Sequence, residues 1–248
     1  ENPIQNIKVD ELEAVPEQSG AVSVRIAGQN TVLRPTADVE IPKEIKDLKA
    51  YRYVKYNYGG YTALHALLDA CEETSISFQC SKGKLTLLDD SAVGATGANA
   101  GWICEINGAV CKDPANTLVN DGDKIEFYYN SDLTGMTYAW LTPEKKEVDR
   151  GTEVTLMLLG KSLSAENAGY SAVAGAEIYD GNKSLGTTDE RGQFVIDTNG
   201  MTLGTHYLTA TLENDEGQNL LTAVMSTITV NKVEDPSADP NTTTVTFR

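Results

Sequence analysis

The sequence predicts a mainly β chain with one helix, divided into two domains. Apolar residues recur at helical spacing in residues 62–73, and no other segment shows this pattern as clearly. Short alternating segments separated by turn residues fill most of the remaining chain, which is typical of β-sheets. The length of 248 residues fits two domains, because a domain usually has about 100–150 residues.

The first half of the chain is predicted to begin with a linker and a strand. Residues 1–20 are polar and acidic and are expected to form a linker or a leading arm. Residues 21–26 alternate between apolar and polar side chains, which predicts a strand, and residues 32–41 predict a short strand plus turns. The helix over residues 62–73 follows, with Thr62 as its N-cap.

Further strands are expected after the helix, and they complete a first domain over residues 21–140. Asn107 and Gly108 form a strong signal for a two-residue hairpin turn. The expected strands are residues 76–80 and 85–88, the hairpin over 102–111, and residues 124–129.

The second half of the chain, residues 141–232, shows no helical period and predicts an immunoglobulin-like β-sandwich. Its boundary is placed at the charged stretch 143–151, and residues 233–248 are expected to form a linker and the start of a further module. The predicted strands are residues 153–159, 176–179, 193–196, 206–212 and 223–230.

The charge of the chain restricts its partners. Twenty Lys and Arg against 36 Asp and Glu give a net charge of −16 and an isoelectric point of about 4.5. Such a surface repels phosphate groups, so we expect no nucleic-acid partner and no attraction to anionic lipid.

No apolar run approaches the ~18–20 residues of a membrane span. The chain begins without a leader segment and is expected to be a mature or excised piece of a secreted protein.

Four cysteines suggest disulfides rather than a metal site. Without C-x-x-C pairs, a zinc site is not expected, whereas the even count fits an oxidising compartment. The hairpin turn sets Cys104 opposite Cys111 with Cα atoms ~4.5–5.5 Å apart, which predicts a Cys104–Cys111 disulfide. The pairing of Cys71 and Cys80 stays open, because Cys71 lies on the apolar face of the helix and packing in the core is the alternative.

No catalytic centre or metal site is predicted. Neither His65 nor His206 has a nucleophile motif around it, and the chain lacks G-x-S-x-G, H-E-x-x-H and phosphate-loop patterns. Asp121 and Asp123 lack the spacing of a calcium loop and are expected to lie in a solvated turn.

Clustered tyrosines are the candidate ligand-binding feature. Tyrosine offers apolar area with a polar tip at little entropy cost, which suits a stacking surface for a sugar or a planar ligand. The alternative is that these tyrosines cover one face of an exposed strand. The candidate residues are Tyr51, Tyr53, Tyr58, Trp102 and Tyr128.

Three motifs in fixed order resemble the transcobalamin-like C-terminal domain of bacterial surface proteins. They are Y-T-A-L-H-A-L-L-D-A at residues 61–70, G-W-I-C-E-I-N-G at 101–108 and V-N-D-G-D-K-I-E-F-Y-Y at 119–129. Val119 stands where the family pattern has Leu. The resemblance covers residues ~20–131 and implies a β-grasp-like α+β domain. In transcobalamin the equivalent domain closes over cobalamin against an α/α barrel, and no such barrel is present in this chain.

The second domain resembles bacterial immunoglobulin-like or collagen-adhesin B-type modules. The resemblance rests on G-T-T-D-E-R-G-Q-F at residues 186–194 and G-T-H-Y-L-T-A at 204–210. Some of these modules form a Lys–Asn isopeptide bond promoted by a Glu. Here the position of that acid is Ala210, so a bond between Lys161 and Asn231 is not expected.

Together these resemblances imply a non-catalytic, adhesin-like module of a protein attached to the cell surface. The first domain would recognise an extracellular glycan, protein or small molecule, and the second would act as a spacer. One alternative is a purely structural stalk, and another is cobalamin binding with a missing partner domain. No other cofactor is expected.

Overall fold

A computed structural model describes residues 18–45, 60–81, 84–89, 91–96, 98–164 and 168–233. The fold is mainly β, as predicted, with one α-helix in these ranges. The chain groups into two compact units. The first runs to Tyr129 apart from the short segments 27–32 and 96–98, and the second holds those segments and the chain from Asn130.

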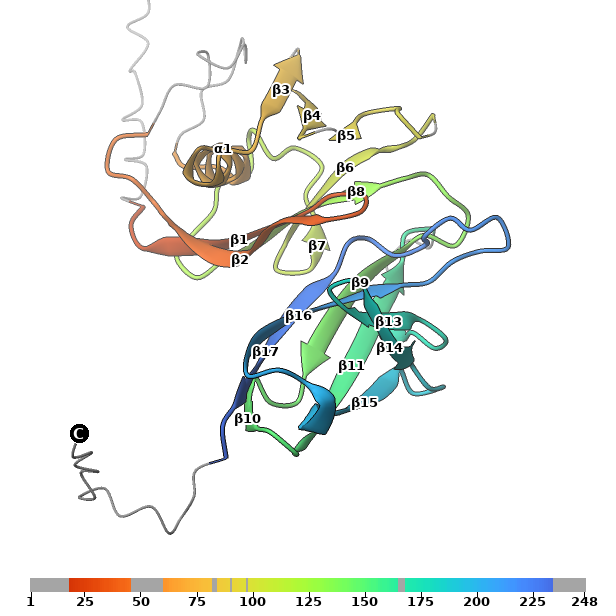
Figure 1. Cartoon of the computed structure of the whole chain (residues 1–248). Coiled ribbons are helices and arrows are strands. Elements are labelled where there is room, and N and C mark those ends of the chain that lie inside the picture. Colours follow the sequence, from red (N-terminus) through yellow and green to blue (C-terminus); the bar gives the residue numbers. More distant parts are fainter. Residues whose placement is uncertain are drawn as a thin grey trace, which may run out of the picture. The chain divides into compact units, whose positions relative to one another are not determined.

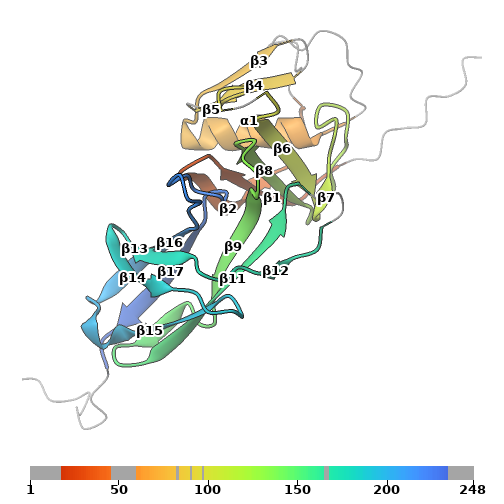
Figure 2. The same ribbon diagram turned by 90° about the vertical axis from the view of Figure 1, so that its right-hand side faces the viewer.

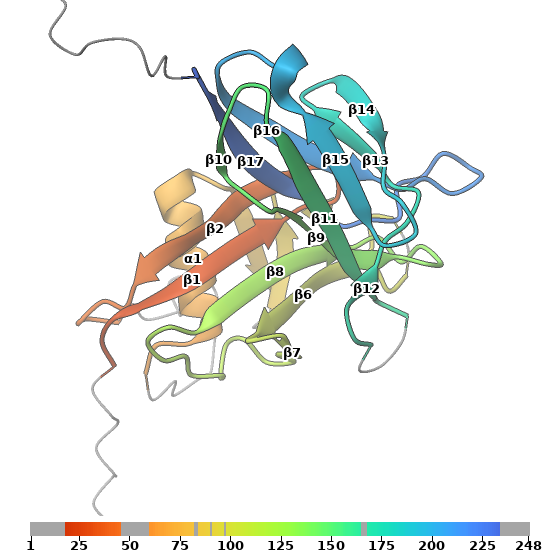
Figure 3. The same ribbon diagram turned by 90° about the horizontal axis from the view of Figure 1, so that it is seen from below.

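The first unit contains a five-stranded sheet with the helix α1 (Ala63–Thr74) against one face (Figure 1). Valines and isoleucines of the sheet and leucines of the helix share one buried core. The strand order is β2-β1-β8-β6-β7, seen side by side in Figure 3. Their bounds are β1 Ala21–Ala27, β2 Val32–Glu40, β6 Gly101–Ile106, β7 Ala109–Val110 and β8 Lys124–Asn130.

The strand β2 is longer than expected. It runs over nine residues, where the sequence suggested a short strand plus turns. It lies at the edge of the sheet, and a proline such as Pro35 is tolerated there because one side of an edge strand needs no ladder hydrogen bond.

A small second sheet completes the first unit. It consists of β3 (Phe78–Ser81), β4 (Lys84–Leu88) and β5 (Ser91–Ala92), drawn beside α1 in Figure 2. Two aromatic side chains fasten β5 to the main sheet. The indole Nε1 of Trp102 donates to the carbonyl of Ser91 at 2.8 Å, and the hydroxyl of Tyr129 donates to the carbonyl of Ala92 at 2.7 Å.

The helix begins where the sequence predicts. Thr62 is the N-cap in extended conformation and accepts from the backbone N–H of His65, while the His65 ring accepts from the backbone N–H of Thr62. This reciprocal capping box normally uses Glu or Gln at the third position.

In the part of the chain that the structure describes, no helix has both the length and the apolar composition of a membrane span.

The second unit consists of sheets that enclose a separate apolar core and is compatible with the predicted β-sandwich. One sheet has the order β10-β17-β16-β13-β14, and in the other β11 pairs with β9, β12 and β15. The first sheet comprises β10 Glu147–Asp149, β13 Glu177–Asp180, β14 Lys183–Thr187, β16 Gly204–Thr211 and β17 Met225–Asn231. The second comprises β9 Thr137–Pro143, β11 Glu153–Ser162, β12 Ser171–Ala172 and β15 Gln193–Asp197.

The predicted boundary at residue 141 falls inside a strand. Leu141 lies in β9, which pairs with β11 opposite Leu158, and the second unit starts earlier, at Asn130. The charged stretch after β9 is not a linker, because β10 lies within it and pairs with β17. In β10 the apolar Val148 is buried and its charged neighbours are exposed. A strand of three residues is too short to be recognised from alternation in the sequence.

Candidate functional site

The hairpin of β6 and β7 brings two cysteines opposite each other. Asn107 and Gly108 form the expected turn, and the register pairs Ile106 with Ala109 and Glu105 with Val110. The next pair along the hairpin is Cys104 and Cys111. The backbone N–H of Cys111 donates to the carbonyl of Cys104 at 2.8 Å.

The predicted Cys104–Cys111 disulfide is not formed, since all four cysteines are free thiols in the structure. The register is as predicted, but the spacing of the two cysteines depends on the kind of pair they form. The backbone bond from Cys111 to Cys104 identifies a hydrogen-bonded pair, in which opposed side chains lie farther apart than in a non-hydrogen-bonded pair. Cβ atoms of such pairs are ~5.5 Å apart, beyond the ~3.5–4.5 Å of a disulfide.

The two thiols are nevertheless coupled. The Cys104 thiol donates to the Cys111 sulfur, which lowers the pKa of Cys111 to about 6, aided by Thr117 and the backbone of Asp113. The same bond, together with burial, raises the pKa of Cys104. The Cys111 Sγ lies 3.3 Å from Thr117 Oγ1 and is half-buried, whereas Cys104 is only 4% exposed. Cys111 therefore combines accessibility with a stabilised thiolate, the two requirements for thiol reactivity.

The other two cysteines also remain thiols. Cys71 is fully buried in the core of the first unit, in agreement with the core-packing alternative, and burial raises its pKa to about 12. Cys80 lies on β3 opposite Leu85 and is partly buried against the same core.

Among the described residues, Trp102 and Tyr128 do not form the predicted aromatic surface. Trp102 packs against the core on the helix side of the sheet. Tyr128 alternates with the core residue Phe127 and so points to the opposite face, where its hydroxyl donates to Glu105 Oε1 at 2.5 Å. These two rings therefore cannot stack on one ligand. Tyr51, Tyr53 and Tyr58 lie outside the described residues.

A buried polar group that was not predicted lies on the sheet face opposite α1. Glu105 is fully buried and accepts from Tyr128, and both alternate with residues of the apolar core. By the same alternation Arg25 and Glu126, both largely buried, share that face. The alternating pattern of residues 101–106 and 124–130 contained this signal, because it places a carboxylate and a phenol on the same side of neighbouring strands.

Both histidines stabilise the fold locally. His65 completes the capping box of α1. In the second unit His206 Nδ1 lies 2.7 Å from Asp180 Oδ2, and its Nε2 lies 2.9 Å from the carbonyl oxygen of Thr202. With both ring nitrogens engaged, His206 links two strands and the loop before β16.

The aspartates of the predicted turn are likewise hydrogen-bonded. Asp121 accepts from the backbone of Ala21 at 2.9 Å, and Asp123 accepts from the Asn107 side chain and the Asn120 backbone, each at 2.8 Å. Within the described ranges, no group of three or more His, Cys, Asp or Glu side chains could hold a metal ion.

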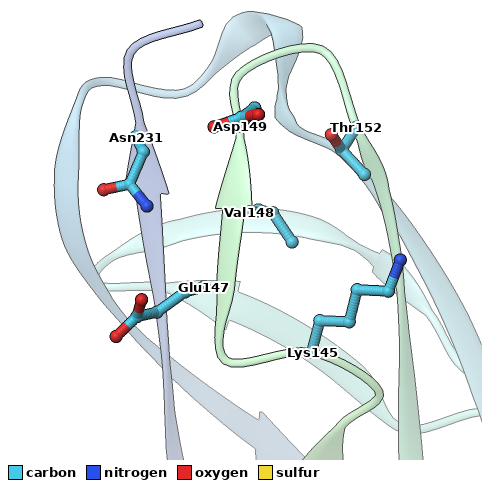
Figure 4. A pocket seen from close by; sticks show the side chains of 6 residues that line it. All are labelled: Lys145, Glu147, Val148, Asp149, Thr152 and Asn231. Atoms are coloured by element: carbon cyan, nitrogen blue, oxygen red, sulfur yellow. The ribbon is translucent and has the colours of Figure 1, made fainter. Parts of the chain in front are cut away.

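A shallow pocket of about 370 Å³ lies in the second unit where β10 and β17 end. In Figure 4 its polar side chains are spread around the opening rather than converging on one point, so they do not form a catalytic arrangement. The lining residues are Lys145, Glu147, Val148, Asp149, Thr152 and Asn231.

The pocket also bears on the isopeptide bond. Asn231 lines it together with Thr152, the residue before β11, whereas Lys161 is the next-to-last residue of β11. At ~3.3 Å per residue, Lys161 is therefore roughly 25–30 Å along the strand from that end. A bond between these two side chains is sterically excluded.

No family profile matches the chain, and no curated protein and no solved structure is significantly similar to it.

Proposed function

We propose that this chain is a non-catalytic recognition module of an extracellular protein attached to the cell surface. The first unit, a β-grasp variant, recognises a ligand or partner, and the second is an immunoglobulin-like spacer. The excess of acidic residues supports this proposal, since a charge of −16 keeps a secreted protein soluble and apart from nucleic acid.

The observation that carries the proposal is how the chemistry-bearing side chains are used. His65 caps the helix, His206 joins Asp180 to a loop carbonyl, and the aspartates of the turn at 120–123 hold backbone N–H groups. A side chain whose polar atoms are occupied in this way is a poor general base, because it must give up a structural hydrogen bond to act.

We assign recognition to the tyrosine-rich segment 51–58. It holds Tyr51, Tyr53 and Tyr58, and such a density of tyrosine is a common feature of binding surfaces. Trp102 and Tyr128 are removed from the proposed surface, because each is committed to a hydrogen bond inside the first unit.

A glycan array probed with the whole chain tests the proposal, followed by capture from host mucus. The triple variant Y51S/Y53S/Y58S is expected to lose binding at least tenfold. The matched control is Y170S/Y207S, because both tyrosines belong to the second unit and are 45% and 55% exposed. Loss of binding in the control instead would move recognition to the second unit.

Calorimetry with cyanocobalamin supplies a separate arm. No heat at near-millimolar concentration removes the corrinoid hypothesis, while saturable heat would replace the glycan or protein ligand by a corrinoid. If neither arm detects binding, the chain is a structural stalk and the recognition proposal is wrong.

A further inference from the structure

We propose that Cys104 and Cys111 form a reversible dithiol–disulfide couple that exchanges with low-molecular-weight disulfides. The couple does not depend on the recognition proposal, because it rests on the β6–β7 hairpin alone. It also differs from a permanent structural disulfide, since we expect both the dithiol and the disulfide form to be populated at different ratios of reduced to oxidised glutathione.

The hairpin register fixes the two thiols as nearest neighbours. The turn at Asn107 and Gly108 and the pair Ile106–Ala109 leave no freedom in the pairing of the next residues. The backbone bond of 2.8 Å from Cys111 to Cys104 closes the pair. Cys104 belongs to the buried core cluster of the first unit and Cys111 packs against the same cluster, so both side chains lie on the same face of the hairpin.

The unequal burial of the two cysteines sets the order of events. Cys111 is half-buried at the edge of the sheet, whereas Cys104 is buried in the core cluster. An external disulfide therefore meets Cys111 first, and Cys104 is reached from its neighbour. The hydrogen bonds that favour the Cys111 thiolate support this order.

The exchange balances in two steps. The Cys111 thiolate attacks one sulfur of a disulfide R–S–S–R, forming the Cys111–S–S–R mixed disulfide and releasing the thiolate R–S⁻. Cys104 then loses its proton and attacks the sulfur of Cys111, forming the Cys104–Cys111 bond and releasing a second R–S⁻. The pair gives up two electrons, the external disulfide is reduced to two thiols, and the two cysteines lose two protons.

The spacing of the pair explains why the bond should be easy to break. A hydrogen-bonded pair holds its Cβ atoms ~5.5 Å apart, so closing the disulfide to ~3.5–4.5 Å must twist the hairpin. Strained disulfides are more reducible than relaxed ones.

The test equilibrates the whole chain in buffers of reduced and oxidised glutathione, with acid quenching, alkylation and peptide mapping by mass spectrometry. The expected result is a Cys104–Cys111 disulfide whose fraction moves from below one tenth to above nine tenths across the accessible ratios. The C104S variant should instead accumulate a glutathione adduct at Cys111, and C111S should show neither product at Cys104. Cys80, which lies opposite Leu85, serves as the internal comparison for a half-buried cysteine.

Three outcomes would overturn the inference. One is a pair that stays reduced at every ratio, which means that the hairpin cannot close. Another is a bond that forms but resists excess reduced glutathione, which identifies a permanent structural disulfide. The third is adduct formation at Cys111 that is equal in wild type and C104S, since it shows that Cys104 does not resolve the mixed disulfide.

Discussion

Arg34 Nη2 lies 2.9 Å from Glu73 Oε2, and this contact joins the edge strand β2 to the last turn of α1. The Arg34 side chain is 5% exposed and that of Glu73 is 49% exposed. The guanidinium also donates to the backbone carbonyls of Val24, Ala37 and Asp38 at 2.6, 2.8 and 3.1 Å. Arg34 therefore organises β2 mainly through the backbone, and the ion pair is its outermost contact.

The variant R34M should lower the free energy of unfolding of the first unit by roughly 2–4 kcal/mol, because three buried or part-buried carbonyls lose their donor. E73Q is the control and should cost less than about 1 kcal/mol, since a half-exposed ion pair is weak. Urea unfolding followed by Trp102 fluorescence in a W140F background reports on the first unit. Equal losses in the two variants would show that the ion pair, and not the backbone contacts, stabilises β2.

The bond between His206 and Asp180 should stabilise the second unit. H206A and D180A are each expected to cost about 1–3 kcal/mol, because each leaves a largely buried partner unsatisfied. The double variant should cost less than their sum by ~0.5–2 kcal/mol, as expected for two residues in direct contact. Trp140 fluorescence in a W102F background measures the unfolding of this unit, and strict additivity would contradict the coupling.

Local signals explain how much of the fold could be predicted from the sequence. The start of α1 depends on Thr62 and three residues after it, and the β6–β7 register depends on Asn107 and Gly108, so both were predicted correctly. The strand β9 was not predicted, because it is stabilised by pairing with β11, a long-range event that local sequence does not reveal. Arg34 gave no sign of burial, since its acceptors are backbone carbonyls that no side-chain pattern reveals.

The candidate site was harder to predict because it depends on faces as well as elements. Trp102 and Tyr128 belong to neighbouring strands and were grouped as rings. Trp102 shares the helix side of the sheet with Cys104, whereas Tyr128 alternates with the core residue Phe127 and lies on the opposite side. The sequence correctly predicted that Cys104 lies opposite Cys111, but this register does not by itself produce a disulfide. How easily two opposed cysteines form a disulfide depends on whether they are a hydrogen-bonded or a non-hydrogen-bonded pair, and counting residues from the turn shows which of the two they are.

Two glycines in similar turns provide a matched comparison in the second unit. The N–H of Gly192 donates to Asp189 O and that of Gly217 to Asn214 O, both at 2.9 Å, with φ values of 71° and 73°. A Cβ on Gly192 would lie 2.5 Å from the carbonyl oxygen of Leu158, whereas one on Gly217 meets nothing within 4 Å. G217A should therefore cost about 1–2 kcal/mol from its left-handed backbone alone.

G192A should cost a further ~1–3 kcal/mol, because the backbone of β11 must move to admit the methyl group. Trp140 fluorescence during urea unfolding in the W102F background measures both variants. Similar losses of unfolding free energy in G192A and G217A would show that the turn at Gly192 moves enough to avoid the clash with the Leu158 carbonyl.

The cysteines should give the first unit a stability maximum at mildly alkaline pH. The pKa of Cys111 is lowered to about 6 in the folded state, compared with ~8.5 for an unfolded cysteine. The unfolded chain therefore binds more protons between these values, and stability rises with pH from about 6 to about 8.5. The contribution of Cys111 to stability is present above its pKa in the unfolded chain and is lost as the pH falls through its pKa in the folded state. C111A should therefore reduce the rise of the unfolding free energy with pH.

Above pH ~8.5 the sign reverses because of Cys71. Burial raises its pKa to about 12, so the folded state keeps a proton that the unfolded chain releases. Its contribution is complete below the unfolded pKa and falls by up to ~1.4 kcal/mol per pH unit above it. Unfolding free energies from Trp102 fluorescence at pH 6–10, under a reductant and in the W140F background, should show less decline in C71A than in the parent. Cys104, whose pKa is also raised, sustains part of the decline in that variant. An unchanged slope in C71A would mean that Cys71 titrates alike in the folded and unfolded states, in conflict with its complete burial.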